Sequence, residues 1–194
     1  MLFILLLIAC VNTNSYPLHF YTTSTHEIFA VGKPKQTGTW KLPPLVKVCK
    51  ELHISHTRVQ IAIAYWRNSG YVFHDILYGY DSPECFGGDY GSGIIITGGE
   101  QDLSEDLMAV TRTSVKTTTD HIIKAKIFIR QKHVNRPRVL EHELGHALGW
   151  KHYPQSMHIM HPTWEKGGYD NSGVVKKLNV HLNKGELWRI QIKL

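Results

Sequence analysis

The stretch HELGHALGWKH at residues 142–152 constrains the fold of this chain more than any other part of its sequence. If the stretch is helical, His142 and His146 are four residues apart, so their imidazoles project from the same face. Two imidazoles in this arrangement can bind one zinc ion at about 2.0–2.1 Å. Glu143 is turned about 100° around the helix from His142, so it can reach a water on the metal without binding the metal itself.

Gly149 and His152 indicate where this helix must end. A third imidazole at position 152 cannot lie on the straight helix face of His142 and His146, so the chain has to stop and turn back. Glycine adopts positive φ at little cost and is the usual residue at such an end. Three imidazoles leave one coordination position open for water, which is typical of a catalytic zinc site. Histidines that are hydrogen-bonded or exposed without any metal are the competing interpretation.

The pattern before this stretch predicts a helix packed on a sheet. Residues 106–116 and 121–131 are rich in β-forming residues and predict two strands, joined by a polar turn at 117–120. A helix is expected over 138–149, with residues 135–137 as its entry. Its apolar side chains can face the sheet; they are Val139, Leu140, Leu144, Ala147 and Leu148.

Two earlier segments complete the predicted layers. Residues 42–54 carry apolar side chains at helical spacing after Pro43 and Pro44, so a helix is expected there. Residues 58–66 alternate and predict a strand. The chain is long enough for one compact domain, and these elements predict an α+β (α/β layered) fold. The other predicted segments are a candidate first strand at 18–23, a glycine-rich loop at 85–93, a strand or buried loop segment at 93–99 and a terminal helix within 183–194.

The stretch at 142–152 matches H-E-x-x-H-x-x-G-x-x-H at every fixed position and therefore resembles the zinc signature of the metzincin metallopeptidases. Met160, followed by Pro162, resembles the methionine-containing turn beneath the zinc in these enzymes, at the spacing of the matrixin branch. LMAVTRT and IIKAKIFI resemble the substrate-aligning edge strand and the next core strand of matrixins. Residues 182–191 resemble their C-terminal helix.

This resemblance implies a metzincin-like zincin fold for residues 41–194. Such a fold has a twisted mixed sheet, two long helices of which one is the active-site helix, a Met-turn and a C-terminal helix. Tyr153 stands where matrixins usually have Ser, and His161 where they usually have Tyr. These departures leave the metzincin branch open. Met157 competes for the Met-turn assignment, but the spacing to Pro162 favours Met160.

The resemblance also implies a zinc-dependent metalloendopeptidase with one catalytic zinc, acting on protein or peptide substrates that lie along part of 106–116. It assigns His142, His146 and His152 as metal ligands, Glu143 as the catalytic base and Met160 as a structural residue. Matrixins often carry calcium as well, but no calcium ligands are assigned here. Two alternatives remain: a membrane-tethered zinc-binding protein without practical proteolysis, and a zinc hydrolase acting on a non-protein amide or ester.

The first ten residues are expected to be an export signal, because an apolar run too short to span a bilayer is followed by a small residue. LIAC at 7–10 also resembles the lipobox of bacterial lipoproteins, which makes Cys10 a candidate membrane tether. No Lys or Arg precedes the run. The protein is therefore expected to be exported, either secreted or lipid-anchored, with residues 11–40 forming an N-terminal segment.

The remaining composition is less specific. The formal net charge of +6, with a basic stretch at 126–138, is read as a solvated surface, and we expect no nucleic-acid partner because no nucleic-acid motif accompanies the charge. Cys49 and Cys85 form either one disulfide or two separate buried thiols. The sequence does not define an oligomeric state.

Overall fold

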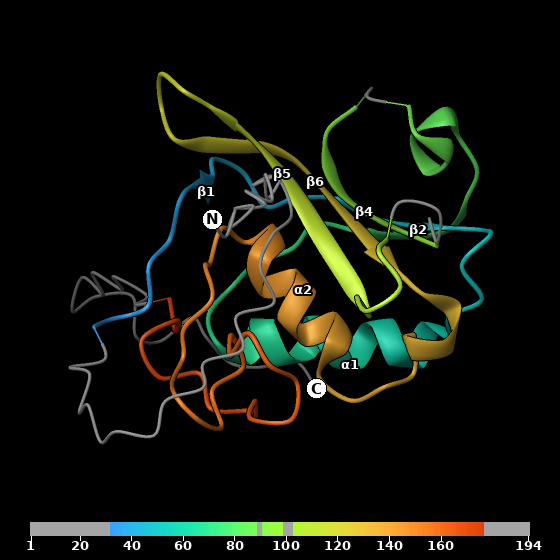
Figure 1. The fold of residues 1–194 in the computed structure, drawn as a ribbon. Helices are drawn as coiled ribbons and strands as arrows, with labels where there is room; N and C mark the ends of the chain where they lie inside the picture. The colour runs from blue at the N-terminus through green and yellow to red at the C-terminus, as the bar shows by residue number, and fades with distance from the viewer. Residues whose placement is uncertain (1–31, 89–90, 99–102, 177–194) are drawn as a thin grey trace, which may run out of the picture. The chain divides into compact units, whose positions relative to one another are not determined.

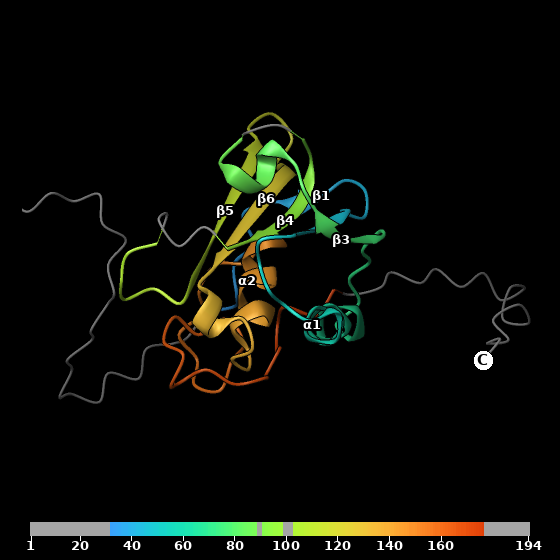
Figure 2. The same ribbon diagram turned by 90° about the vertical axis from the view of Figure 1, so that its right-hand side faces the viewer.

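Six β-strands form one mixed sheet, and two α-helices pack on one side of it (Figure 1, Figure 2). The computed structural model describes residues 32–88, 91–98 and 103–176, and every structural statement here refers to these residues. The strands are β1 (Thr39–Trp40), β2 (Val46–Cys49), β3 (Ile76–Tyr80), β4 (Gly93–Thr97), β5 (Ala109–Lys116) and β6 (His121–Ile129). The helices are α1 (His56–Asn68) and α2 (Val139–Ala147), with 3-10 turns η1 (Pro83–Phe86) and η3 (Gln131–His133).

The sheet runs β3-β2-β4-β6-β5, and the short β1 pairs with the start of β6. All pairs are parallel except β5 with β6, which are antiparallel. Among the described strands β5 pairs with β6 alone, so its other side is an open edge. The strands predicted within 106–116 and 121–131, with their connecting turn, are confirmed. The run at 93–99 forms β4, all of whose residues are buried, and not a loop.

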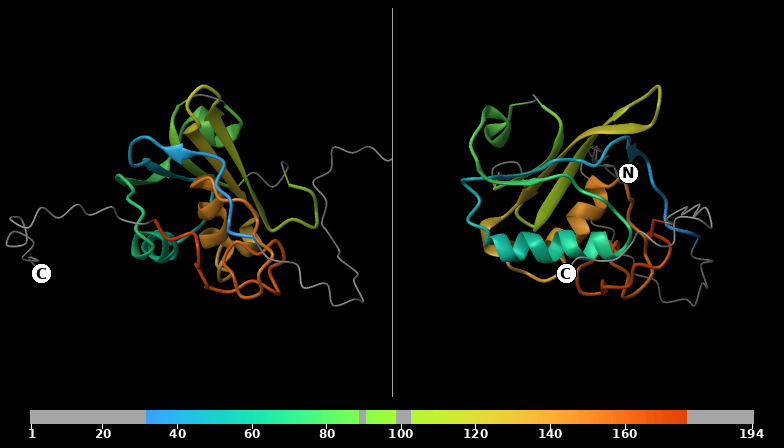
Figure 3. Two further views of the ribbon diagram at one scale, coloured as in Figure 1. Left: turned by 90° about the vertical axis from the view of Figure 1, so that its left-hand side faces the viewer. Right: turned by 180° about the vertical axis from the view of Figure 1, so that it is seen from behind.

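Both helices lie on the same face of the sheet (Figure 3). The hydrophobic core lies between the helices and the sheet. All five apolar side chains predicted for the helix over 138–149 are buried. The fully buried indole of Trp66 on α1 donates a 2.7 Å hydrogen bond to the carbonyl oxygen of Glu141 on α2. The layered α+β fold predicted from the sequence is confirmed. Its predicted C-terminal helix lies outside the described residues.

The strand predicted at 58–66 was wrong, because this segment lies within helix α1. Val59, Ile61, Ile63 and Tyr65 alternate in sequence, but Ile61 is exposed. The buried apolar residues of α1 follow helical spacing instead and are Val59, Ala62, Ile63 and Trp66. The Ser55 side chain accepts a hydrogen bond from the Arg58 backbone N–H and caps the helix. The Ser55 cap and the helical spacing of the buried residues favour a helix more strongly than the β-branched residues of this segment favour a strand.

The helix predicted at 42–54 was also wrong, because residues Val46–Cys49 form β2 in the middle of the sheet. A strand covered on both faces is buried along its whole length and shows no alternation. The four residues of β2 are all buried. They include Lys47, whose ammonium pairs with the Glu84 carboxylate at 2.9 Å. This ion pair allows a charged residue at a buried strand position. The sequence therefore lacks the continuous apolar run that would indicate a buried strand. The strand β3 was not predicted.

A buried ion pair joins the two helices. The guanidinium of Arg58 on α1 donates two hydrogen bonds, of 2.9 and 2.6 Å, to the two carboxylate oxygens of Glu141 on α2. It also donates to the backbone oxygen of Arg136 at 3.3 Å, just before α2 begins. Glu141 immediately precedes the predicted metal-binding stretch. The pair therefore fixes how the helix bearing that stretch lies on α1.

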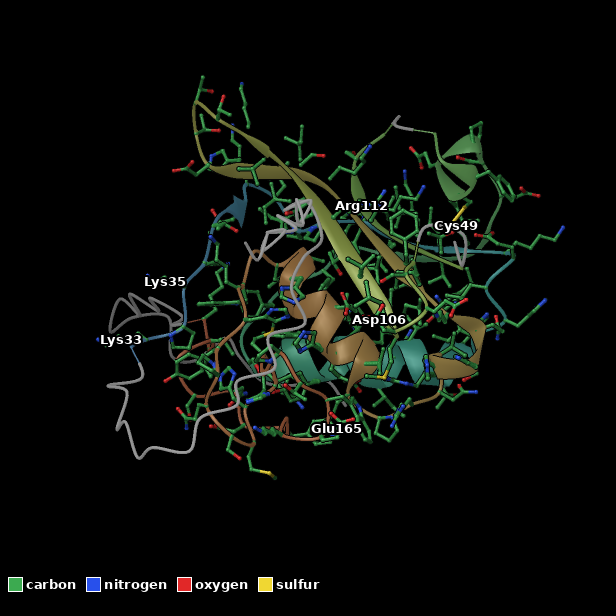
Figure 4. The ribbon with its side chains drawn as sticks, in the orientation of Figure 1. Lys33, Lys35, Cys49, Asp106, Arg112 and Glu165 are labelled. Carbon is green, nitrogen blue, oxygen red and sulfur yellow. A yellow bond between two sulfur atoms is a disulfide. The ribbon has the colours of Figure 1, made fainter. Side chains whose placement is uncertain are left out.

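Cys49 and Cys85 form a disulfide, which settles the alternative left open by the sequence (Figure 4). Their Cα atoms are 5.8 Å apart, and the bond links the end of β2 to η1 across 36 positions of sequence. Together with Ile95, the two cysteines form a small buried cluster separate from the main core.

Residues 35–40 are part of this fold, although the sequence assigned them to the N-terminal segment: β1 pairs with β6, and residues 35–37 bond to the chain just after α2. The domain boundaries themselves stay a prediction. The export signal, Cys10, the candidate strand at 18–23 and the predicted terminal helix lie outside the described residues. Within the part of the chain that the structure describes, no helix has the length and apolar character needed to cross a membrane.

We expect Arg58→Met to lower the free energy of unfolding by about 3 kcal/mol, because it leaves the buried Glu141 carboxylate without its partner. Equilibrium urea unfolding measures the change. Lys50→Met is the matched control, because Lys50 pairs with Asp81 at 4.0 Å with both side chains exposed, and such pairs contribute little. Equal effects of the two substitutions would show that the buried pair does not stabilise the helix packing.

Candidate metal centre

The structure brings the imidazoles of His142, His146 and His152 together. The first two project from successive turns of α2, and the third comes from the chain beyond Gly149. The ring centroids are 4.7 Å apart for 142 and 146, 5.3 Å for 142 and 152, and 4.6 Å for 146 and 152. One nitrogen from each ring lies within 4.8 Å of the other two. The three predicted ligands can therefore reach one ion.

Backbone hydrogen bonds fix which nitrogens of the first two rings face the cluster. His142 Nδ1 lies 2.7 Å from the carbonyl oxygen of Ile159, and His146 Nδ1 lies 2.7 Å from that of Trp150. A carbonyl oxygen has no proton to donate, so both Nδ1 atoms must carry the hydrogen. The two Nε2 atoms, which are 3.1 Å apart, are therefore both bare acceptors in the neutral rings.

This arrangement fits a metal ion. Burial and the neighbouring imidazoles lower the pKa of His142 well below its usual value and that of His146 to about 4, so no proton separates the two lone pairs at neutral pH. A tetrahedral zinc ion with Zn–N bonds of about 2.0–2.1 Å holds its nitrogen ligands roughly 3.3 Å apart. The 3.1 Å separation of the Nε2 atoms is close to this distance. Backbone carbonyls that accept from the other ring nitrogen are the usual outer partners of zinc-binding histidines.

Gly149 ends helix α2 and turns the chain toward His152. Its φ is +95°, and the backbone N–H groups of Gly149 and Trp150 donate to the carbonyls of His146 and Gly145, the pattern of a Schellman ending. The same turn supplies the Trp150 carbonyl that orients His146.

An N-terminal segment holds this turn in place. Thr37 N–H donates to the Gly149 carbonyl at 2.8 Å, and Lys151 N–H donates to the Lys35 carbonyl at 2.9 Å. The backbone of Gly38 lies so close that a Cβ at position 149 would collide with the Gly38 carbonyl oxygen. The path of the chain between the second and third rings therefore depends on residues far away in the sequence.

Met160, predicted to be a structural residue, is fully buried. Its thioether packs against Gly145, where an added Cβ would collide with the Met160 sulfur. Gly145 lies on α2 just before His146. Tyr153 N–H donates to the Met160 carbonyl at 2.8 Å, which ties the residue after His152 to this turn.

His158 organises the Met160 turn from inside the protein, a role that the sequence did not reveal. The Met160 N–H donates to His158 Nδ1 at 3.0 Å, so Nε2 carries the proton and donates to the Ser172 carbonyl at 3.1 Å. The ring is fully buried and packs edge-on against Tyr153. His161, which follows Met160 directly, is buried as well.

Glu143 is buried at the side of α2 that faces the edge strand β5. Burial raises its pKa to about 7, and a hydrogen bond from the Thr111 hydroxyl acts in the opposite direction. That bond is 2.6 Å long and ends on Glu143 Oε2. Thr111 was not predicted as a site residue, because nothing in the local sequence connects position 111 with position 143.

A second group of potential ligand atoms among the described residues does not resemble a metal site. Cys49, Glu51 and Cys85 lie close together, but the two sulfurs are joined in the disulfide and offer no thiolate.

We expect Gly149→Ala to weaken zinc binding at least tenfold, because the added Cβ forces the turn between His146 and His152 to move. Competition titration against a fluorescent chelator measures the affinity. Gly79→Ala is the matched control, because Gly79 also has positive φ, at +65°, but open space where the Cβ would lie. Unchanged zinc affinity in Gly149→Ala would show that this turn does not position the third ring.

We expect His158 to make the protein less stable in mild acid. Burial lowers its pKa below the usual 6.5, against opposing effects of Ser172 and Asp170, with His161 lowering it further. The unfolded chain therefore binds the proton first, so this contribution to stability is complete above pH 6.5 and is lost as the pH falls below it. His158→Asn keeps an acceptor for Met160 but does not titrate. The difference in unfolding free energy between pH 7.5 and 5.5 should be smaller in this variant than in the parent; an equal difference would contradict the assignment.

The relationship to known proteins agrees with the site. The family model described as Matrixin matches residues 47–191, which is well over half of the chain. This span begins in β2 and includes the three-histidine cluster, Glu143 and Met160. Comparisons with curated proteins and with solved structures gave no match. The resemblance drawn from HELGHALGWKH and Met160 is thus confirmed at the level of the family, and the chain is a member of the matrixins, a family of zinc metallopeptidases.

Proposed function

We propose that this protein is a zinc-dependent endopeptidase that hydrolyses peptide bonds of protein substrates. The observation that carries the proposal is the meeting of three neutral imidazoles, two with facing lone pairs, beside a buried carboxylate and an open strand edge. Family membership supports the same activity. His142, His146 and His152 are the proposed ligands of one zinc ion, and Glu143 is the proposed general base. Any additional calcium stays unassigned.

When bound, zinc would supply a Lewis acid that makes a water molecule more acidic and polarises the scissile carbonyl. Glu143 takes the proton from the attacking water and delivers it to the leaving amine. Burial raises the pKa of Glu143 above the usual value of a carboxyl, which makes it a stronger base. Met160 supports the rings from below and takes no part in the proton transfer.

The open edge of β5 supports an extended peptide as substrate. A peptide that pairs with this edge gains main-chain hydrogen bonds without regard to its sequence, while its side chains remain available for selection. Thr111 lies in β5 and contacts Glu143, so a peptide on this edge runs past the base. The strand thus delivers a backbone amide, which favours peptide hydrolysis over the alternative of a non-protein substrate.

We further propose that the protein is exported, and either secreted or tethered to a membrane through Cys10. The Cys49–Cys85 disulfide supports export, because disulfides persist mainly in oxidising compartments.

Glu143→Gln tests the mechanism. We expect the variant to keep one zinc per chain, because the three imidazoles are intact, and to cleave an unfolded protein substrate about 10²–10⁴-fold more slowly. Zinc content is measured by elemental analysis and cleavage by the release of new amino termini. Asp81→Asn, the same change at an exposed carboxylate on the β3 side, should leave both values unchanged.

Two results would overturn the proposal. One is parent-like cleavage by Glu143→Gln. The other is a zinc-loaded parent protein that cleaves nothing across a broad peptide library, which would favour a zinc-binding protein without proteolysis. Removal of zinc with a chelator should abolish cleavage, and added zinc should restore it.

A further inference from the structure

The hydroxyl of Thr111 connects the edge strand to the carboxylate of Glu143. Its oxygen lies 2.6 Å from Glu143 Oε2 and 3.1 Å from the Glu143 backbone oxygen. The hydroxyl has one proton, and the shorter contact to the charged oxygen is the stronger one. Among the described residues, Thr111 is the side chain that bonds this carboxylate, which leaves Oε1 for a water molecule.

The sheet fixes where this hydroxyl lies. Thr111 is paired with Ile127 of β6, whose buried side chain belongs to the core between sheet and helices. Neighbouring residues of a strand point to opposite faces. The guanidinium of Arg112, the next residue, accordingly lies over the ring of Phe128 on the other face, 5.0 Å from its centroid. The Thr111 side chain is thus directed toward α2 by backbone pairing and not by its contact with Glu143.

A threonine suits this position better than other residues with a hydroxyl. Its branched Cβ restricts χ1, so the hydroxyl has few alternative directions. The terminal torsion of a glutamate is broad, so a carboxylate without a fixed partner can rotate. A hydrogen bond from a rigid strand removes this freedom from one oxygen. The other oxygen then keeps a constant position relative to the imidazoles.

We propose that Thr111 is a positioning residue for the general base: it holds Glu143 Oε2 so that Oε1 is directed at the attacking water. This inference rests on the proposed peptidase function. Because the same residue lies in the strand that receives the peptide, the base and the substrate backbone share one support. A shift of β5 would move both together and preserve their register.

Thr111→Val tests the proposal, because valine has the same shape without the hydroxyl. We expect kcat to fall about ten- to hundredfold, as for loss of a hydrogen bond to a charged group, while KM changes less than twofold. Zinc content and melting temperature should match the parent. Thr111→Ser restores the hydroxyl and should recover at least half of the parental kcat. Thr119→Val, in the exposed turn between β5 and β6, is the matched control and should be unchanged.

A crystal structure of zinc-loaded Thr111→Val gives a second readout that does not depend on turnover. We expect the Glu143 carboxylate to leave its parental position or to occupy two orientations, whereas the parent shows one.

Parental kcat in Thr111→Val, or a rise in KM alone, would overturn the positioning role. So would an unmoved Glu143 carboxylate in its structure. Failure of the peptidase function is distinguishable, since it would appear in the parent and in Glu143→Gln before any Thr111 variant is compared.

Discussion

Two backbone carbonyl oxygens, those of Ile159 and Trp150, impose the arrangement on which the rest of the site depends. Each accepts the Nδ1 hydrogen of one imidazole, so the Nε2 lone pairs of His142 and His146 are directed at each other. Neither ring can relieve this contact by tautomerising without losing its carbonyl partner. The turn at the end of α2 and the segment before Met160 therefore act together. They direct the Nε2 lone pairs of two imidazoles to the place where a cation would bind.

The helix layer and the sheet fix the position of α2, which carries these two histidines. The Arg58–Glu141 pair and the Trp66 hydrogen bond lock α2 onto α1 from below, just before the first ligand. From above, β5 lies along α2 and contacts Glu143 through Thr111. β5 lies at the edge of the sheet: one side pairs with β6, and none of the other described strands pairs with its second side. In the proposed function, this sheet order decides which side of α2 can meet a substrate.

The sequence predicted that the three imidazoles meet, because helix periodicity and one glycine within an eleven-residue stretch indicate it. The bonds from residues 35–37 that hold the turn at Gly149 left no such local pattern. Contacts between distant segments left no such pattern: the Thr111–Glu143 bond and the burial of His158 follow from how strands and turns pack. The exchange of helix and strand at 42–66 has a similar cause, because burial of Lys47 depends on Glu84, which lies 37 positions away. Local propensity was outweighed there by tertiary contacts.

Residues 35–37 bond to the turn at Gly149. The smallest part of the chain that can form the three-histidine site therefore includes them. The Gln36 side chain donates to the Leu148 carbonyl across 112 positions of sequence, and the neighbouring backbone bonds span similar distances. A fragment that starts at residue 47, where the family match begins, would lack these partners. Contacts between such distant parts of a chain form slowly. The turn that carries the third imidazole is accordingly held in place only when the first and last thirds of the chain have met.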